Sequence, residues 1–237
     1  MDYKVAVLAY NFSHRKTKDI LTILNSHNIK NVLVIAAPKV KLKHNSSKKL
    51  SLVKNQEFLH PRKLCKQFKF SYEVCEHDNF AKIKELTLRE KSNLAIISGA
   101  RIIKQNILDL FKYRVINYHP GALPETSGLD SFYWMIKKNI RPSVSAHFIN
   151  RQVDSGDLIQ ELILKINPKF SVEDVKEALY SEQLNLHEMI CKKIAKNERF
   201  ISTAIFRPIK NNIMEEEEKE RVLKEFNLWK KNYSVSN

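Results

Sequence analysis

Short apolar runs alternate with segments of helical periodicity along this chain. The runs are typical of strands buried on both faces of a sheet, and they lie at residues 5–10, 31–37, 94–98 and 114–118. Segments that place apolar residues three and four apart, as on one face of a helix, lie at residues 15–27, 79–91, 104–112 and 131–139. Strands and helices in this alternation predict an α/β fold with a mainly parallel, twisted sheet and helices on its faces.

Three further stretches read as strands, and one long helix follows them. The strands are expected at 70–74, at 143–149 and at 158–166. Ser171 is followed three residues later by Asp174, which is a helix-capping signal. We therefore expect one long helix after Ser171, which ends the main part of the chain.

The last stretch of the chain predicts an amphipathic helix over 214–231. Its apolar face consists of Val222, Leu223, Phe226 and Trp229. We divide the chain into a main domain over 1–200 and a short helical C-terminal extension over 201–237. The apolar face of that helix should dock on the main domain or on a second subunit, which leaves a homodimer open.

The composition says more about the surroundings in which the protein would work than about its function. The chain has 237 residues, of which 43% are apolar, so it can bury a sizeable core. The net charge is +15, and six lysines without an acid lie from Lys39 to Lys54, which suits either a solvated surface or an anionic partner.

The cysteines and the apolar runs indicate where such a chain would work. The three scattered cysteines have neither metal-ligand nor disulfide spacing, which predicts a reducing compartment. The N-terminus does not resemble a signal peptide, and no apolar run reaches the ~18 residues of a membrane span. We expect a cytoplasmic protein with no membrane partner.

The few glycines of this chain gather where ligands bind in α/β proteins. All four lie between Gly99 and Gly156, and most of them follow an expected strand end. Ligands of parallel α/β sheets sit beyond the carboxyl ends of the strands, although ordinary turns need glycine too. The chain has neither a G-x-G-x-x-G after its first strand nor a phosphate-binding P-loop, so a dinucleotide or triphosphate site is not indicated.

A polar pair ends the expected strand at 114–118. In N-Y-H-P-G-A-L-P, Asn117 and His119 are two residues apart, so they point to the same side of a strand, and Pro120 ends the run. Asp154 lies in a later turn, V-D-S-G-D, and His147 reads as a packed residue beside the site. Each of these residues alone could have an ordinary structural role. Their order along the chain is a more specific indication of function.

That order resembles the formyltransferase family that uses 10-formyltetrahydrofolate. The resemblance rests on N-Y-H-P-G-A-L-P (117–124), S-A-H-F-I (145–149) and V-D-S-G-D-L-I (153–159), in this order and spacing. It extends over about residues 3–200 and is strongest over 94–166. It implies a Rossmann-like formyltransferase catalytic domain over 1–200, with 10-formyltetrahydrofolate as co-substrate and no metal.

The resemblance also implies the roles of the catalytic residues, which match Asn117, His119 and Asp154. An amine attacks the formyl carbon, and the formyl oxygen gains negative charge. The Asn117 amide and a protonated His119 would donate hydrogen bonds to that oxygen. Asp154 would favour the imidazolium form of His119 and help to move the proton from the amine.

Two segments match the family's folate site. The segment Ala100, Arg101, Ile102 and Ile103 corresponds to the part of the family that binds the pterin edge through its backbone. The loop from Asn150 to Asp157, which contains Gly156, corresponds to the wall of the same pocket. Arg101 could also meet the carboxylates of the folate.

The sequence indicates the acceptor of the formyl group less clearly than it indicates the reaction. Members that formylate nucleoside-diphosphate amino sugars open with a strand and an aromatic, polar loop, as Tyr10 and Asn11 do here, and carry a segment like G-L-D-S-F-Y-W-M-I (128–136). We therefore favour a nucleotide sugar, with Tyr10, Asn11, Gly121 and Trp134 as expected substrate-binding residues. Nucleic acid is not expected as a partner.

Two other groups of the family are alternatives. One is kept, and the other is disfavoured by its length. Glycinamide ribonucleotide formyltransferases have a glycine-rich loop after the first strand, which is absent here, although Ser13, Arg15 and Lys16 could hold a phosphate. Methionyl-tRNA formyltransferases add a large C-terminal β domain, for which this chain is too short. Outside the enzymes, a non-catalytic or RNA-associated α/β binding protein would not require Asn117, His119 and Asp154 together.

Overall fold

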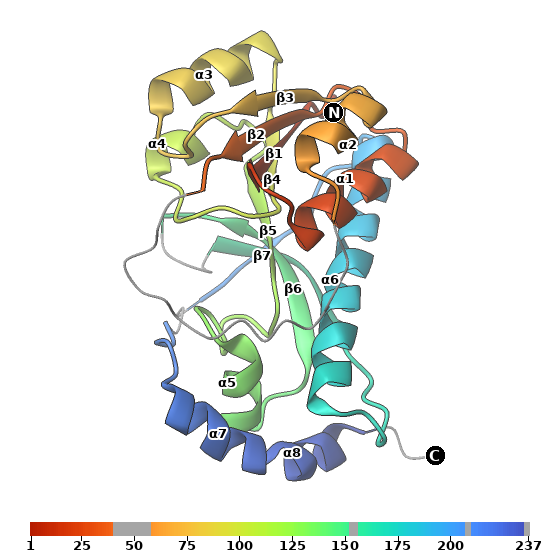
Figure 1. Cartoon of the computed structure of the whole chain (residues 1–237), viewed down its shortest axis with the longest axis vertical. Helices are drawn as coiled ribbons and strands as arrows, with labels where there is room; N and C mark the ends of the chain where they lie inside the picture. Colours follow the sequence, from red (N-terminus) through yellow and green to blue (C-terminus); the bar gives the residue numbers. More distant parts are fainter. Residues whose placement is uncertain (40–57, 152–155, 207–209, 235–237) are drawn as a thin grey trace. The chain divides into compact units, whose positions relative to one another are not determined.

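The structure is a computed structural model, and it describes residues 1–39, 58–151, 156–206 and 210–234 (Figure 1). Most of the lysine-rich stretch and Asp154 therefore lie outside the described residues. The strands follow the order β3-β2-β1-β4-β5-β6-β7-β8. The chain divides into an N-terminal unit, Met1–Asn117 with His187–Phe200, and a C-terminal unit, Tyr118–Leu186 with Ile201–Asn237.

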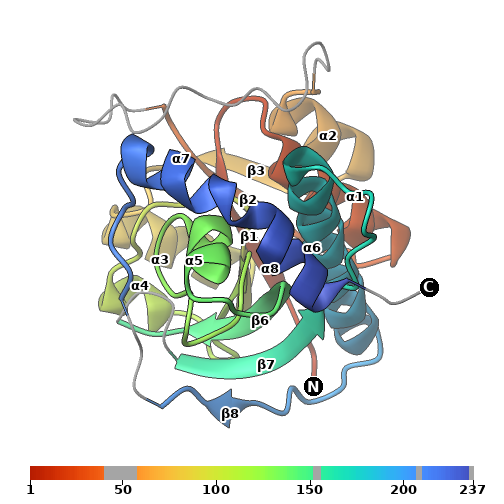
Figure 2. The same cartoon turned by 90° about the horizontal axis from the view of Figure 1, so that it is seen from below.

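The N-terminal unit is a parallel sheet with helices on both faces. Its strands are β1 (Val5–Tyr10), β2 (Leu33–Ala37), β3 (Ser71–Val74), β4 (Leu94–Ile97) and the start of β5 (Val115–His119). Helices α1 (Arg15–Ser26) and α2 (Pro61–Phe68) lie on one face, and α3 (Phe80–Arg89) and α4 (Gln105–Leu108) lie on the other (Figures 1 and 2). The α/β fold with a mainly parallel sheet is thereby confirmed.

The apolar runs form strands because their side chains are buried on both faces of the sheet. The residues of β1 from Val5 to Ala9 are each 0% exposed, as expected for a strand covered on both faces. The α1 helix turns Ile20, Leu21 and Leu24 into the same core. The cysteines Cys65, Cys75 and Cys191 are buried and free.

Helix α2 was not predicted, and α4 is shorter than expected. The α2 helix has only eight residues, and its start is marked by Pro61 in the first turn and by His60, whose Nδ1 accepts the Arg62 N–H at 3.2 Å. It ends at Lys69, which has a left-handed backbone. The expected helix over 104–112 contracts to Gln105–Leu108.

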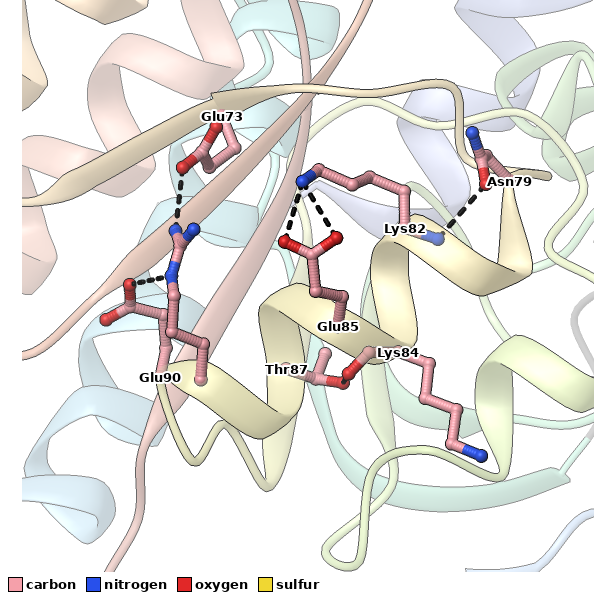
Figure 3. Close-up of polar contacts among 8 residues, drawn as sticks. Glu73, Asn79, Lys82, Lys84, Glu85, Thr87 and Glu90 are labelled. Carbon is pink, nitrogen blue, oxygen red and sulfur yellow. Dashed lines mark hydrogen bonds and ion pairs between the residues drawn. The ribbon is translucent and has the colours of Figure 1, made fainter.

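Helix α3 carries a set of polar contacts at the surface, which Figure 3 shows. Asn79 caps it, because its Oδ1 accepts the Lys82 N–H at 3.1 Å. The Lys82 ammonium lies 2.7 Å from Glu85, and the Arg89 guanidinium bonds Glu73 at 2.6 Å. These side chains are exposed or half-buried, so they shape the surface of the unit rather than its core.

The C-terminal unit combines an antiparallel hairpin with helices. Its elements are β6 (Ser143–Ile149), β7 (Gly156–Ile163), β8 (Thr203–Ala204), α5 (Ser131–Lys137), α7 (Glu216–Lys224) and α8 (Phe226–Tyr233). Helix α6 (Val172–Ala195) begins in this unit and ends in the N-terminal one. Its start confirms the capping signal, because Asp174 accepts the Ser171 N–H at 2.9 Å and Ser171 Oγ accepts the Asp174 N–H at 3.1 Å.

The expected C-terminal helix is present as two helices, α7 and α8, which run past α5 in Figure 2. Val222, Phe226 and Trp229 of the predicted apolar face are 4%, 5% and 2% exposed and thus buried, whereas Leu223 is half-buried. The Trp229 ring lies 6.1 Å from that of Phe132 in α5. Within the described residues, no helix is both long and apolar enough to cross a membrane.

Candidate active site

His119 is the last residue of β5, and its side chain is 3% exposed. Its Nε2 lies 2.9 Å from the carbonyl oxygen of Thr126 and 3.1 Å from Ser131 Oγ. A carbonyl oxygen can only accept a hydrogen bond, so Nε2 carries the proton. The Nδ1 atom is then the one that gains or loses a proton when His119 titrates.

The turn after His119 is built to bring Thr126 back to it. Thr126 donates both its N–H, at 2.9 Å, and its hydroxyl, at 2.7 Å, to the carbonyl of Ala122. A Cβ on Gly121 would lie 2.1 Å from Thr126 Oγ1, so only glycine permits this close approach. The carbonyl of Gly121 accepts the hydroxyl of Ser145 at 2.8 Å. Gly121, expected in substrate binding, thus has a packing role as well.

His147 lies in β6 and is 0% exposed. Its ring centroid is 6.5 Å from that of His119, and the two rings are nearly perpendicular at 87°. A register shift of the β6–β7 ladder falls between Ala146 and His147. This placement agrees with the interpretation of His147 as a packed residue beside His119.

Asn117 precedes His119 by two residues in β5 and is half-buried. Residues two apart in a strand point to the same face, which is the arrangement expected for two donors to one oxygen. Asp154, the third member of the expected trio, lies outside the described residues.

The loop that contains Asp154 begins and ends on the β6–β7 hairpin. In that hairpin, Ile149 pairs with Gly156 and Phe148 pairs with Asp157. Gly156 has a φ of +123°, and a Cβ there would lie 2.1 Å from the carbonyl oxygen of Phe148, so glycine is required. Asn150 is exposed beside this pair. The expected folate-site residues Asn150, Gly156 and Asp157 therefore gather at one end of the hairpin.

The expected pterin-side segment lies beyond the carboxyl end of β4 in the N-terminal unit. Arg101 is exposed, Ile102 is 78% exposed, Ala100 is half-buried, and Ile103 is buried at 6%. Arg101 and Ile102 border a hollow of about 110 Å³. The other residues that line it are Ala37, Pro38, Glu76, His77, Asp78 and Lys104. They lie after the carboxyl ends of β2, β3 and β4, where α/β sheets bind ligands.

His77 gives this hollow a hydrogen-bond acceptor that no described residue satisfies. The side chain is 5% exposed, and its Nε2 lies 3.0 Å from the carbonyl oxygen of Ile35, so Nε2 carries a proton. Its Nδ1 is buried without a hydrogen-bond partner among the described residues. Burial lowers the pKa of His77, so the ring is held neutral with Nδ1 ready to accept a bond.

Tyr10 and Asn11 lie at the carboxyl end of β1, as expected for ligand contacts. The Tyr10 ring stacks on Phe12 at 5.0 Å, and burial raises the pKa of its hydroxyl, which stays neutral. A Cβ on Gly99 would lie 2.7 Å from the Tyr10 ring. The Asn11 Oδ1 atom accepts the hydroxyl of Tyr72 at 2.7 Å, so Asn11 would meet a ligand with its amide N–H₂.

Trp134 is half-buried in α5, and its N–H donates to the carbonyl of Asn212 at 3.1 Å. The ammonium groups of Lys137 and Lys138 each lie 5.0 Å from its ring. The indole therefore holds the C-terminal segment, while its role toward a substrate stays a prediction.

Sequence reasoning missed Thr126 and Ser131, which lie within hydrogen-bond distance of Nε2 of His119. It also missed Asn211, which bonds the turn that carries Thr126. The sequence signal for Thr126 and Ser131 is weak: both follow the P-G-A-L-P segment, where hydroxyl residues also serve ordinary turns. For Asn211, 92 residues beyond His119 in the sequence, we find no signal at all.

Comparisons with known proteins show the family of this chain. A model of the formyl transferase family matches residues 3–190. The phosphoribosylglycinamide formyltransferase of Bacillus subtilis is 21% identical over 131 residues, which are 53% of this chain and 67% of that protein.

Two solved structures share the fold. The N-formyltransferase from Helicobacter canadensis, solved with folinic acid and dTDP-3-aminofucose, has a TM-score of 0.63 at 17% identity and covers 99% of this chain and 84% of its own. The phosphoribosylglycinamide formyltransferase from Anaplasma phagocytophilum has a TM-score of 0.62 at 15% identity, with 83% and 89% covered. The chain belongs to the formyl transferase family and is a folate-dependent formyltransferase.

Proposed function

We propose that this chain transfers the formyl group of 10-formyltetrahydrofolate to the amino group of a nucleoside-diphosphate amino sugar. The observation that supports this reaction is the fixed orientation of the His119 ring. Its Nε2 proton is held by the Thr126 carbonyl at 2.9 Å, so the other ring nitrogen, Nδ1, is the one that would take part in proton transfer.

The chain's own groups suit the chemistry that the folate brings. When bound, 10-formyltetrahydrofolate supplies an electrophilic formyl carbon. The Asn117 amide would donate a hydrogen bond to the formyl oxygen as that oxygen gains charge, and one such donor is worth about 3 kcal/mol. His119, protonated at Nδ1, would donate to the same oxygen. Asp154 would favour that protonated form and accept the proton that the amine loses.

The hollow at Arg101 fits a part of the folate. Ala37, Pro38 and Ile102 offer apolar contact to a flat ring, and Arg101 and Lys104 offer cations to carboxylates. The unsatisfied Nδ1 of His77 calls for an N–H donor, and a pterin carries several. We propose Ala100 to Ile103 as folate-binding residues of the N-terminal unit, and Asn150, Gly156 and Asp157 as folate-binding residues of the C-terminal unit.

The C-terminal extension favours a sugar nucleotide as the acceptor. The Helicobacter canadensis enzyme, which was solved with dTDP-3-aminofucose, covers 99% of this chain, whereas the phosphoribosylglycinamide formyltransferase from Anaplasma phagocytophilum covers 83%. The difference in coverage favours a relationship that includes the extension. Tyr10, Asn11, Gly121 and Trp134 are the proposed contacts of this substrate.

Glycinamide ribonucleotide remains the second candidate acceptor. The Bacillus subtilis protein that is 21% identical is a phosphoribosylglycinamide formyltransferase, which supports this acceptor. The start of α1 could take its phosphate, because no side chain caps the helix at His14. However, Arg15 already lies 3.8 Å from Asp19, which reduces its charge toward a phosphate.

A substrate panel tests the proposal directly. The full chain is incubated with 10-formyltetrahydrofolate and, separately, with amino-sugar nucleotides, glycinamide ribonucleotide and charged initiator tRNA, and mass spectrometry reads the product. We expect one formyl group on an amino-sugar nucleotide and none with His119→Ala. Formylation of glycinamide ribonucleotide alone would replace the proposed acceptor, and formylation of none of them would contradict the proposal.

A further inference from the structure

We propose that Asn211, in the C-terminal extension, is a positioning residue for His119. It holds the two carbonyl groups on either side of Thr126, and Thr126 in turn holds the proton on Nε2 of His119. This inference rests on the proposed catalytic role of His119, and all of its residues lie in the C-terminal unit.

The side chain of Asn211 is committed to the turn after His119. Its Nδ2 donates to the carbonyl of Glu125 at 3.0 Å and to the carbonyl of Ser127 at 2.8 Å. An amide nitrogen has two protons, so both are used, one on each neighbour of Thr126. The backbone N–H of Asn211 also donates to Ser127, at 3.0 Å. Asn211 is 8% exposed, so water does not easily replace these bonds.

Asn211 is itself held in place by the segment that it braces. The ammonium of Lys138 donates to Asn211 Oδ1 and, at 2.9 Å, to the carbonyl of Glu125. Gly128 pairs with Asn211 in a parallel bridge and has a φ of +101°. A Cβ on Gly128 would lie 2.5 Å from the Asn211 carbonyl oxygen, so a glycine is needed for this approach.

The next residues anchor the segment to α5 and to Asp130, the residue before that helix. The carbonyl of Asn212 accepts the Trp134 N–H at 3.1 Å, and the N–H of Met214 donates to Asp130 Oδ2 at 3.0 Å. Asp130 also lies 3.3 Å from the ammonium of Lys219, whose side chain is 9% exposed. The extension is thereby fixed at several points close to Asn211, which makes it a rigid support for the turn.

The consequence for His119 follows from the direction of the Thr126 carbonyl. A peptide group has less freedom to turn when the peptide groups on both sides of it are held, and Asn211 bonds the carbonyls of both neighbours of Thr126. Without Asn211, the Thr126 carbonyl can turn away, and the His119 ring can place its proton on either nitrogen. A ring that the Thr126 carbonyl no longer holds can also turn, and its Nδ1 would then no longer be aimed at the formyl oxygen, so a fraction of the enzyme would be inactive.

Asn211→Asp is the sharpest variant for this inference. Its side chain has the same size and can still accept from Lys138, but it presents oxygen to the two carbonyls that Asn211 now binds, and oxygen cannot donate. Asn211→Ala is the second variant, and it keeps the backbone bond to Ser127. Asn232→Ala is the matched control: this asparagine also lies in the extension, but it is exposed and bonds Asn139 at 3.1 Å.

Two measurements are made on the full chain after circular dichroism has verified folding. The first is ¹⁵N NMR of the His119 ring, which reports the Nε2–H form directly and needs no substrate. The second is the steady-state kcat and KM of formyl transfer. We expect kcat to fall on the order of 10- to 100-fold with little change in KM, and the ring signals to shift to a mixture of the two neutral forms. The control should change neither.

The two readouts separate this inference from the proposed reaction. A mixture of forms in both variants, without formyl transfer to any acceptor by the wild type, would support the positioning role and contradict the proposed function. Wild-type ring signals in both folded variants would overturn the positioning role, whatever the activity. An unchanged kcat in a variant whose ring signals have shifted would overturn it too, because the fixed proton would then be irrelevant to turnover.

Discussion

Two polar clusters of this chain, one on α3 and one around Asn211, differ in their exposure and in the sequence separation of their members. The cluster on α3 in Figure 3 joins residues close in sequence: Lys82 bonds Glu85 three residues on, and Arg89 bonds Glu73 sixteen residues back. The cluster around Asn211 joins residues 73 to 86 positions apart. The α3 cluster lies at the surface, whereas Asn211 is 8% exposed.

Exposure and sequence separation explain the difference. Solvent and salt screen an exposed ion pair, and its long side chains lose entropy when they are held. A buried donor that loses its partner costs about 1–3 kcal/mol, since water cannot replace the bond. The contacts of Asn211 also tie two distant segments together, so their loss would move a segment rather than a side chain.

The largest effect is expected at the residue that the buried cluster supports. His119→Ala should lower kcat by roughly 100-fold or more, because the general acid and a donor to the formyl oxygen are both lost. The fold should persist, as measured by circular dichroism. Glu85→Gln in the α3 cluster serves as the control and should retain wild-type kcat. Near-wild-type turnover by His119→Ala would remove His119 from the mechanism.

Trp229 tests whether the extension is a structural part of its unit. Its ring is 2% exposed, and its N–H donates to the carbonyl of Ile140 at 2.7 Å. Trp229→Ala should lower the free energy of unfolding by about 3–5 kcal/mol, which urea denaturation would measure. The adjacent Leu228 is 67% exposed, so Leu228→Ala should change it by about 0.5 kcal/mol or less. Equal effects of the two changes would mean that α8 is not docked.

His187 tests whether burial alone makes a polar side chain important for the stability of the fold. Its Nε2 lies 3.2 Å from the carbonyl oxygen of Ile20, 167 residues away. Burial, with smaller contributions from Lys16 and His27, lowers the pKa of His187 to about 4. The folded state therefore keeps the ring neutral, while the unfolded chain takes up a proton below pH ~6.5.

The stability contributed by neutral His187 is full above pH ~6.5 and is lost as the pH falls toward 4. The loss amounts to about 3 kcal/mol in total. Urea denaturation at a series of pH values should show this slope, and His187→Gln should flatten it. If the variant and the wild type lose stability in parallel over this range, the buried ring is not its source.

The smallest effect is expected in the α3 cluster. Glu85→Gln removes the charge that the Lys82 ammonium approaches at 2.7 Å, and hydrogen bonding from Lys82 lowers the pKa of that carboxyl. Because the pair is exposed, we expect no change in the midpoint of thermal unfolding beyond the error of calorimetry at moderate salt. A clear drop would show that the cluster acts as a network and would weaken the contrast with Asn211.

Local patterns in the sequence were sufficient for most of the fold. The apolar run at 5–10 is β1 to the residue, and the capping signal at Ser171 begins α6. The strand is readable because a continuous apolar run indicates burial on both faces, and the helix start is readable because its capping contacts join near neighbours. The apolar face of the extension was readable for the same reason, and Phe226 and Trp229 are buried as predicted.

Short elements and helix ends were less readable. Helix α2 is eight residues long, too short for its periodicity to stand out, and only Pro61 marks it. The predicted helix over 214–231 is interrupted at Glu225, where α7 ends and α8 begins. The local pattern could not specify that break, because the apolar face continues through it.

The sequence by itself determined that Asn117 and His119 share a strand, because two residues in β5 are two positions apart whatever surrounds them. Only the tertiary structure decided which ring nitrogen of His119 is held and what holds it. Thr126 reaches the ring through a turn that needs Gly121, and Asn211 reaches that turn from 84 residues beyond Ser127. Contacts across such separations leave no periodic trace in a single sequence, since each depends on chain segments that meet only after the core has formed.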